Sequence, residues 1–132
     1  MLRCALRYIV RNMSSAFPAD LLHLQVAEHG ADARVVTATG EVDALTAPKL
    51  ADVLTAQLAV ARLVVVNLDG VRFLSSAGLR ALFQAHEFAT RERRDLRLVC
   101  HSQAANWALE ITGLRAHFTF IDNAAGSTGL RP

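Results

Sequence analysis

Two adjacent serines, Ser75 and Ser76, are the residues of this chain whose type and setting are best suited to chemistry. They follow the apolar run Leu63–Val66, which has the composition of a strand buried on both faces, and an exit turn predicted at Asn67–Gly70. From Leu79 onward the apolar residues are spaced as on a helix. Both hydroxyls therefore lie at the beginning of a predicted helix, where free backbone N–H groups and the helix dipole favour negative charge. A phosphoryl group at this place would be compatible with the fold.

These serines have two alternative interpretations. The structural one is that one hydroxyl caps the helix and the other has no special role. The enzymatic one is a nucleophilic hydrolase, since such enzymes place a serine on a strand-to-helix turn. Their motif has Gly two positions before the serine, where this chain has Leu74, and neither His101 nor His117 can be assigned as a triad partner. We therefore name no catalytic residue and expect a protein that is not an enzyme.

Size and charge restrict the classes of function. The chain has 132 residues, of which 52% are hydrophobic and 20% charged, and this predicts one globular domain with a substantial core. The basic cluster Arg91–Arg94 favours a solvated helix end, and a chain with one Trp and one Tyr lacks the stacking residues of a nucleic-acid surface. No apolar run approaches the ~20 residues of a membrane helix. We therefore expect neither nucleic acid nor a membrane as a direct partner.

The residue types that bind metals or cofactors are too scattered to form a site. Cys4 and Cys100 make no CxxC pair, and the five histidines have no ligand spacing. Gly40 and Gly78 do not belong to a glycine-rich nucleotide loop. Cys100 ends an apolar run and is predicted to be buried in a strand. We therefore expect no metal and no cofactor, and a reducing cytoplasm as the compartment.

The first half of the chain predicts a β-hairpin followed by a helix. Residues 22–26 alternate in hydrophobicity as a half-buried strand does, residues 34–39 return as a second strand, and Gly40–Asp43 is expected to break it. Thr46 is a suitable N-cap for the helix, and Pro48 suits its first turn. The apolar face of this helix consists of Leu50, Val53, Leu54 and Leu58.

The second half predicts a strand, a helix and a last strand. The strand spans residues 96–100, Ser102 caps the helix, Gly113 ends it, and the last strand spans residues 117–121. The helix is expected to bury a stripe made of Ala104, Trp107, Ala108 and Ile111. Trp107 is thus predicted to lie in or at the edge of the core; the alternative is an exposed anchor for a partner, because Trp is enriched in interface hot spots.

Strands that alternate with helices predict an α/β layer fold. We expect a mixed, mostly parallel sheet of four to five strands, with the N-terminal hairpin at one edge and the helices packed on the sheet. The domain is expected to span residues 20–122. A loosely ordered N-terminal extension is expected at residues 1–19, and a flexible tail at residues 123–132.

Three segments stand in an order that is typical of one protein family. They are Thr39–Asp43 before the first predicted helix, Leu63–Leu82 around the two serines, and Ile111–Leu114 near the end. The second corresponds to a motif written Asp-Ser-Ser/Thr-Gly-Leu after an aromatic and an apolar residue. In these segments the chain resembles a STAS-domain protein of the anti-sigma factor antagonist type. The resemblance covers residues 21–122, and it places Ser75 at the position of the motif's Asp and Ser76 at the serine that follows.

This resemblance implies a STAS-like fold and a regulatory binding protein of the bacterial cytoplasm. Family members bind an anti-sigma factor that is itself a serine kinase and so release a sigma factor, until phosphorylation of the serine after the motif's Asp ends the interaction. It implies that Ser76 is the phosphorylation site, with Ser75 as the second choice; Ser75 can cap the helix as the Asp would, but it supplies no charge. The implied partner-binding surface consists of Gly40, Glu41, Asp43, Ser75, Ser76, Ala77, Gly78 and Arg80.

The main alternative within this resemblance is a STAS module with another task. Such a module would be a scaffold of a stressosome-like assembly, or part of a sensor system that phosphorylation does not control. A weak homodimer is a further association that the sequence leaves open. If phosphorylation does occur, we expect the protein to stay folded, because the helix N-terminus stabilises the new charge, and to change only its affinity for the partner.

Overall fold

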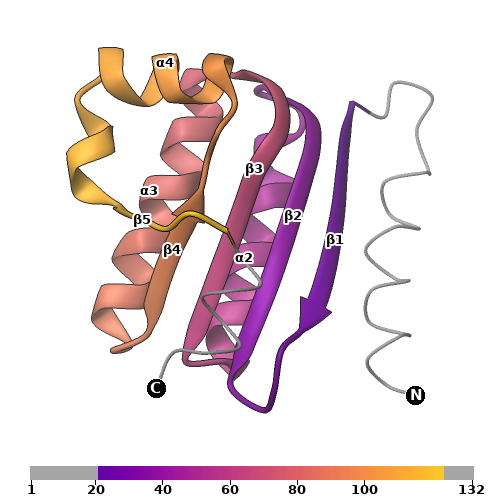
Figure 1. Ribbon diagram of the computed structural model, residues 1–132, viewed down its shortest axis with the longest axis vertical. Coiled ribbons are helices and arrows are strands. Elements are labelled where there is room, and N and C mark those ends of the chain that lie inside the picture. Colours follow the sequence, from indigo (N-terminus) through magenta and orange to yellow (C-terminus); the bar gives the residue numbers. More distant parts are fainter. Residues whose placement is uncertain (1–20, 124–132) are drawn as a thin grey trace.

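The computed structural model describes residues 21–123, so the predicted extension at residues 1–19 and all but the first residue of the predicted tail lie outside the described part. Strands, helices and one 3-10 turn follow one another along the chain (Figure 1). They are β1 (Leu22–Glu28), β2 (Ala33–Val42), α2 (Ala47–Val60), β3 (Leu63–Leu74), α3 (Ser76–Arg91), β4 (Asp95–Val99), α4 (Gln103–Ile111), η1 (Leu114–His117) and β5 (Thr119–Phe120).

The strands form one five-stranded sheet in the order β1-β2-β3-β4-β5. Strands β1 and β2 pair antiparallel, with Leu22 opposite Gly40 and Glu28 opposite Arg34. All other neighbours pair in parallel. The predicted fold class, a mixed and mostly parallel sheet with an N-terminal hairpin, is confirmed.

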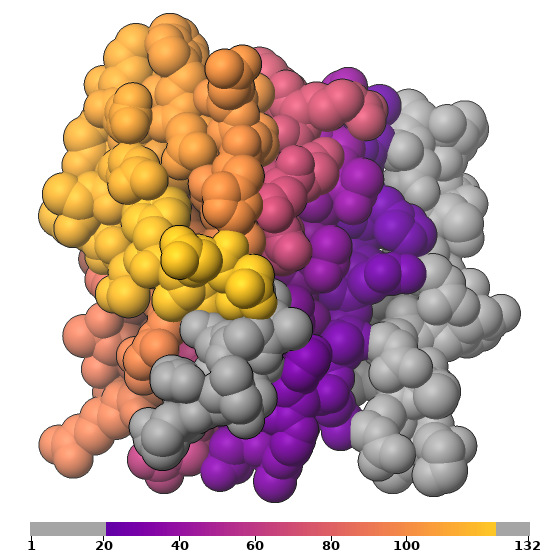
Figure 2. All heavy atoms as spheres, in the orientation of Figure 1, coloured from indigo at the N-terminus to yellow at the C-terminus, as the bar shows by residue number. Residues whose placement is uncertain are grey.

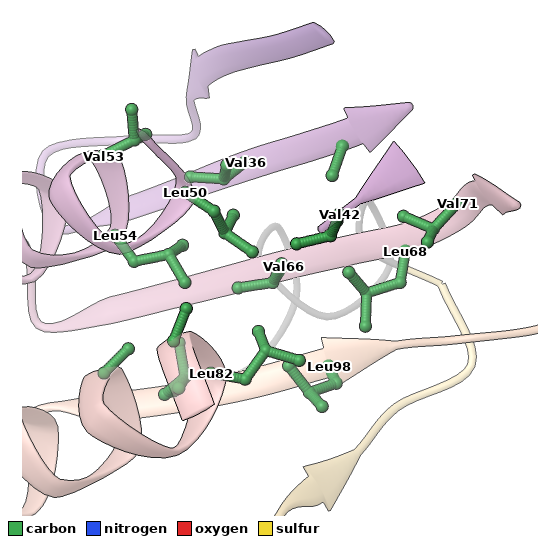
Figure 3. Close-up of a cluster of buried hydrophobic side chains, with 14 of the residues drawn as sticks. Val36, Val42, Leu50, Val53, Leu54, Val66, Leu68, Val71, Leu82 and Leu98 are labelled. Carbon is green, nitrogen blue, oxygen red and sulfur yellow. The ribbon is translucent and has the colours of Figure 1, made fainter. Parts of the chain in front are cut away.

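The core lies between the sheet and the helices α2 and α3, which run side by side behind the sheet in Figure 1. The predicted apolar face of α2 is buried as expected, from Leu50 to Leu58. Its side chains share one cluster with β-branched and leucine residues of the central strands: Val36 lies near Leu50, and Leu98 lies near Leu82 of α3 (Figure 3). The sheet and these two helices therefore form a rigid support for the residues at the ends of β2 and β3.

Strands β2 and β3 are longer than the sequence predicts. Gly40–Val42 does not break the second strand but continues it, and Asn67–Gly70 is not an exit turn but the middle of β3. The register between β2 and β3 shifts where Thr37 pairs with Asn67 and Thr39 pairs with Gly70, so the extra residues form a β-bulge. The side chain of Asn67 accepts a hydrogen bond from the Asp69 N–H at 2.9 Å within this bulge. Pairing with the neighbouring strand therefore overrides the local turn signals.

Helix α4 buries a different stripe from the one predicted. Its buried residues are Ala105, Ala108 and Leu109, whereas Trp107 is 65% exposed and Ile111 is 62% exposed. Both stripes have helical spacing, and the structure buries the one that contains smaller side chains. The predicted placement of Trp107 in the core is thus wrong; its side chain is exposed, as the alternative requires, and its role as an anchor for a partner stays a prediction.

The two predicted ends of α4 are confirmed. The Ser102 hydroxyl accepts a hydrogen bond from the Ala105 N–H at 3.2 Å, and Gly113 follows the helix with a φ of 77°. The last strand is shorter than predicted, because η1 occupies the residues up to His117. Cys100 is buried as expected, although β4 ends one residue before it.

Candidate functional site

The ends of β2 and β3 bring the two predicted site segments together. Both strands run toward the upper edge of the sheet in Figure 1, where β2 leads to α2 and β3 leads to α3. Val42 pairs with Leu74, and the Ser75 N–H donates a hydrogen bond to the Val42 carbonyl at 2.9 Å. Residues 40–43 and 75–78, which are far apart in the sequence, therefore lie side by side.

Ser75 is the N-cap of α3. Its backbone is extended, with φ −84° and ψ 175°, and its hydroxyl oxygen accepts a hydrogen bond from the Gly78 N–H at 3.2 Å. Its carbonyl accepts a hydrogen bond from the Leu79 N–H at 2.9 Å. The side chain is half-buried. Ser75 therefore performs the capping role for which a serine or an aspartate is suited at this position.

Ser76 is the first residue of α3, and its side chain is exposed. It lines an open groove between α2 and α3 with a volume of about 380 Å³. Most of the groove is lined by small side chains, so a large partner can approach the serine. The lining residues are Ala44, Ala47, Pro48, Ala51, Ser76, Ala77, Arg80, Ala81 and Gln84.

Gly78 is buried where α3 passes over the strand ends. A Cβ atom at this position would lie 2.7 Å from Leu74 Cδ1 and 2.7 Å from Val42 Cγ1. Both distances are far below van der Waals contact. The absence of a side chain at Gly78 therefore allows the start of α3, with its two serines, to lie directly on the sheet.

Gly40 and Glu41 are the two residues before Val42, the last residue of β2. Gly40 has a φ of 114°, and a Cβ atom there would collide with the Leu21 carbonyl oxygen. The Glu41 N–H donates a hydrogen bond to that same carbonyl at 2.9 Å. The Glu41 carboxylate lies 3.5 Å from the Arg72 guanidinium in an exposed ion pair. Gly40 thus shapes the backbone, while Glu41 presents a charge at the edge of the site.

Asp43 stabilises the turn between β2 and α2. Its Oδ1 atom accepts hydrogen bonds from the Leu45 N–H and the Thr46 N–H, each at 3.0 Å. Thr46 is the N-cap residue of α2, as predicted, but its side chain makes no capping hydrogen bond. Its hydroxyl instead donates to the Glu41 carbonyl at 3.0 Å and accepts from the Asp43 N–H at 2.9 Å. The predicted Pro48 in the first turn is confirmed.

Arg80 lies one helical turn after Ser76 on the same groove and is exposed. Within residues 21–123 its guanidinium makes no hydrogen bond and no ion pair. The structure therefore brings all the predicted site residues to one edge of the molecule. They are Gly40, Glu41, Asp43, Ser75, Ser76, Ala77, Gly78 and Arg80.

A second groove lies between the end of β3 and α4, and the sequence did not predict it. Phe73 is 50% exposed and stands with Trp107 in its wall; the groove has a volume of about 670 Å³. Figure 2 shows that α4 itself forms a corner of the molecular surface. One wall residue of this groove could be anticipated, because an exposed anchor was the alternative interpretation of Trp107. Nothing in the sequence indicated that Phe73 is exposed.

Among the described residues, neither His101 nor His117 makes a hydrogen bond to Ser75 or Ser76. The ring of His101 contacts Asp69, with Nδ1 3.1 Å from Oδ1. The backbone N–H of His101 donates a hydrogen bond to the same Oδ1 atom at 2.7 Å. His117 packs edge-on against Phe83, with ring centroids 5.8 Å apart. Among residues 21–123, no group of three histidine, cysteine or acidic side chains is placed to hold a metal ion.

Burial raises the pKa of the Cys100 thiol, because desolvation disfavours the thiolate. The buried thiol donates only a weak hydrogen bond to the Ser102 carbonyl, with Sγ 3.9 Å from the oxygen. In the part of the chain that the structure describes, no helix combines the length and the apolar character that crossing a membrane requires.

Comparisons with known proteins match the chain to one domain family and to solved structures of the same fold. Residues 24–126 match the family model described as STAS domain. The structure is similar to that of an anti-sigma factor antagonist from Mycobacterium paratuberculosis, with 28% sequence identity, a TM-score of 0.72, and coverage of 83% of this chain and 92% of that one.

More distant structures share the fold. SpoIIAA, an anti-sigma factor antagonist solved in its unphosphorylated form, has 13% identity, a TM-score of 0.65, and coverage of 76% of this chain and 89% of that one. A putative anti-sigma factor antagonist from Thermotoga maritima has 14% identity, a TM-score of 0.66, and coverage of 79% and 90%. No protein of curated function matches the sequence significantly.

Proposed function

Because the chain belongs to the STAS-domain family, we propose that it is an anti-sigma factor antagonist whose partner binding is switched off by phosphorylation of Ser76. In this proposal the unmodified protein binds an anti-sigma factor of the serine-kinase type and so releases a sigma factor in the bacterial cytoplasm. The similar structure from Mycobacterium paratuberculosis carries the same class name, which supports the proposal.

The observation that carries the proposal is the exposure of Ser76 at the first residue of α3. A kinase can reach this hydroxyl from the open groove between α2 and α3. The neighbouring Ser75 is the second choice, because its oxygen is half-buried and already accepts the Gly78 N–H. Ser75 thus holds the start of the helix in place, and Ser76 presents the acceptor.

The reaction at Ser76 is a phosphoryl transfer from ATP held by the partner kinase. The Ser76 Oγ atom forms a bond to the γ-phosphorus, the bond from that phosphorus to the β,γ-bridging oxygen breaks, and ADP leaves. The hydroxyl proton passes to a base of the kinase. The product carries about −1.5 to −2 charge and three acceptor oxygens at the start of α3.

The new charge affects the complex more than the domain. The phosphoryl group at the N-terminus of α3 lies where the helix dipole favours an anion and where solvent reaches it, so the domain tolerates it. A partner surface that covers Ser76 would have to desolvate the dianion, which is costly without a cation opposite. A hundredfold loss of affinity corresponds to only about 2.7 kcal/mol.

The rest of the binding surface supplies shape and charge. Ala77 and the small residues of the groove let a partner approach closely. Glu41 presents a carboxylate near the end of β2, and Arg80 presents a guanidinium that has no ion pair among residues 21–123. Gly40, Asp43 and Gly78 act on the backbone that positions these side chains.

The test is binding to purified candidate anti-sigma factors with variants at Ser76. Ser76→Ala should bind as the unmodified protein does and should resist release by ATP, whereas Ser76→Glu should bind more weakly. Thr55→Glu, which adds the same charge to the exposed face of α2, is the matched control and should leave binding unchanged. If Ser76→Ala and Ser76→Glu both bind and release like the parent protein, Ser76 is not the switch.

One observation favours a second candidate function. Ser75 stands where the family motif has an Asp, so the site lacks the carboxylate beside the acceptor serine. A STAS scaffold or sensor module that phosphorylation does not control would not need that carboxylate. A protein that no partner kinase phosphorylates, but that still binds its partner, would support this second function.

A further inference from the structure

We infer that Arg80 is the counter-ion, within the same molecule, of a phosphoryl group on Ser76. This inference rests on the proposed function in one respect, the identity of Ser76 as the acceptor. It concerns what happens inside the protein after phosphorylation. Arg80 is then a positioning residue for the phosphoryl group and part of the regulation of the site.

The first argument is the spacing along α3. Ser76 and Arg80 are four residues apart within the helix Ser76–Arg91, so their side chains project from the same face one turn apart. Both side chains line the groove between α2 and α3. An anion at position i with a cation at position i+4 is the favourable order for an ion pair on a helix. The guanidinium also has the planar fork of donors that fits phosphate oxygens.

The second argument is the charge around the groove. Arg80 is the one charged side chain among the described residues that line this groove. Within residues 21–123 it has no ion pair of its own, so no existing partner competes for it. The two acidic residues near the end of β2 have partners of their own: Glu41 pairs with Arg72, and Asp43 accepts two N–H groups of its own turn.

The consequence is a switch with two components. Unmodified, the groove presents a cation, which has no ion pair among the described residues, beside a neutral serine. Phosphorylated, it presents a dianion, and Arg80 is turned toward that dianion and is no longer available to an acidic group of the partner. Phosphorylation thereby changes the sign of the charge at this groove while the fold is retained.

The experiment uses the full chain with phosphoserine incorporated at position 76 during synthesis, and it follows the phosphorus-31 resonance as a function of pH. Arg80 favours the dianion, so the titration midpoint in Arg80→Gln should lie higher than in the parent by roughly 0.4 pH unit at low salt. The titration midpoint in Arg80→Lys should lie between these two values. The Nε–H resonance of Arg80 should shift on phosphorylation. Circular dichroism of each variant shows whether it is folded.

Arg91→Gln is the matched control, because it removes an exposed arginine from the last turn of the same helix. Its titration midpoint should equal that of the parent. Equal midpoints in the parent and in folded Arg80→Gln would overturn the inference. Because phosphoserine is installed without a kinase, this result is independent of the proposed function, which fails separately if no partner kinase modifies Ser76.

Discussion

Substitution of Gly78 by alanine tests whether the start of α3 lies on the sheet as closely as the structure places it. Two effects of opposite sign compete. Alanine is a better helix former than glycine by up to about 1 kcal/mol. Its Cβ atom, however, would lie 2.7 Å from Leu74 Cδ1 and 2.7 Å from Val42 Cγ1, and both neighbours are buried. Overpacking of this kind costs about 1–3 kcal/mol.

The steric cost should exceed the gain in propensity, so Gly78→Ala should lower the free energy of unfolding by about 1 kcal/mol. Leu74 can turn its terminal methyl group aside, but Val42 is β-branched and stiff. Urea denaturation followed by circular dichroism measures the change. The pair Gln84→Gly and Gln84→Ala on the exposed face of α3 measures the propensity effect alone.

A double-mutant cycle isolates the contact. Val42→Ala removes the Cγ1 atom that the new Cβ would meet, so Gly78→Ala should cost less in that background, by roughly 1 kcal/mol. If Gly78→Ala instead stabilises the parent protein as much as the propensity difference at position 84 predicts, the close packing of α3 on β2 and β3 is contradicted.

Two further predictions concern Ser75 and Cys100. Ser75→Ala removes the acceptor of the Gly78 N–H and should lower the free energy of unfolding by about 1 kcal/mol, while Ser75→Asp retains the cap; equal urea midpoints for all three proteins would contradict the cap. In a Cys4→Ser background, Cys100 should react with a thiol reagent roughly a hundredfold more slowly in the folded protein than in urea. Burial raises the pKa of its thiol above the ordinary value of 9.0, so the unfolded chain releases the proton first, and the free energy of unfolding should fall as the pH rises past that ordinary value. A rapid reaction in the folded state, or a stability that rises over this pH range, would refute the burial.

Local patterns predicted much of the fold. The buried face of α2, from Leu50 to Leu58, follows from helical spacing alone, and a serine cap at the start of α3, like the cap at Ser102, follows from residue type at a strand-to-helix boundary. These features depend on a few neighbours in the sequence. They could be predicted because the residues that set the pattern lie within a few helical turns of one another in the sequence.

Features that depend on distant partners could not be predicted. Residues 40–42 and 67–70 have the composition of turns, but pairing between β2 and β3 makes them strand, with a bulge that the sequence does not mark. Trp107 lies on one of two overlapping stripes of α4, and packing against β3 selects the other. The need for a glycine at position 78 likewise depends on a distant residue, because the side chain that a Cβ atom there would meet belongs to Val42 of β2.

The site was predicted in part. The serines at the start of α3 were found from their setting, and the resemblance added residues 40–43. What the sequence could not supply is the engagement of Ser75 as the cap, the exposure of Ser76, and the position of Arg80 on the same groove without a counter-ion in the described residues. These depend on where the ends of β2 and β3 meet.

The central claim is that a negative charge on Ser76 repels the partner without unfolding the domain. The most direct measurement is calorimetric titration of the anti-sigma factor with this protein, unmodified and fully phosphorylated at Ser76, together with the melting temperature of each form. We predict a dissociation constant that rises by about a hundredfold, or about 2.7 kcal/mol, with melting temperatures that differ little. Equal affinities, or a phosphorylated form that melts far below the unmodified one, would contradict the account.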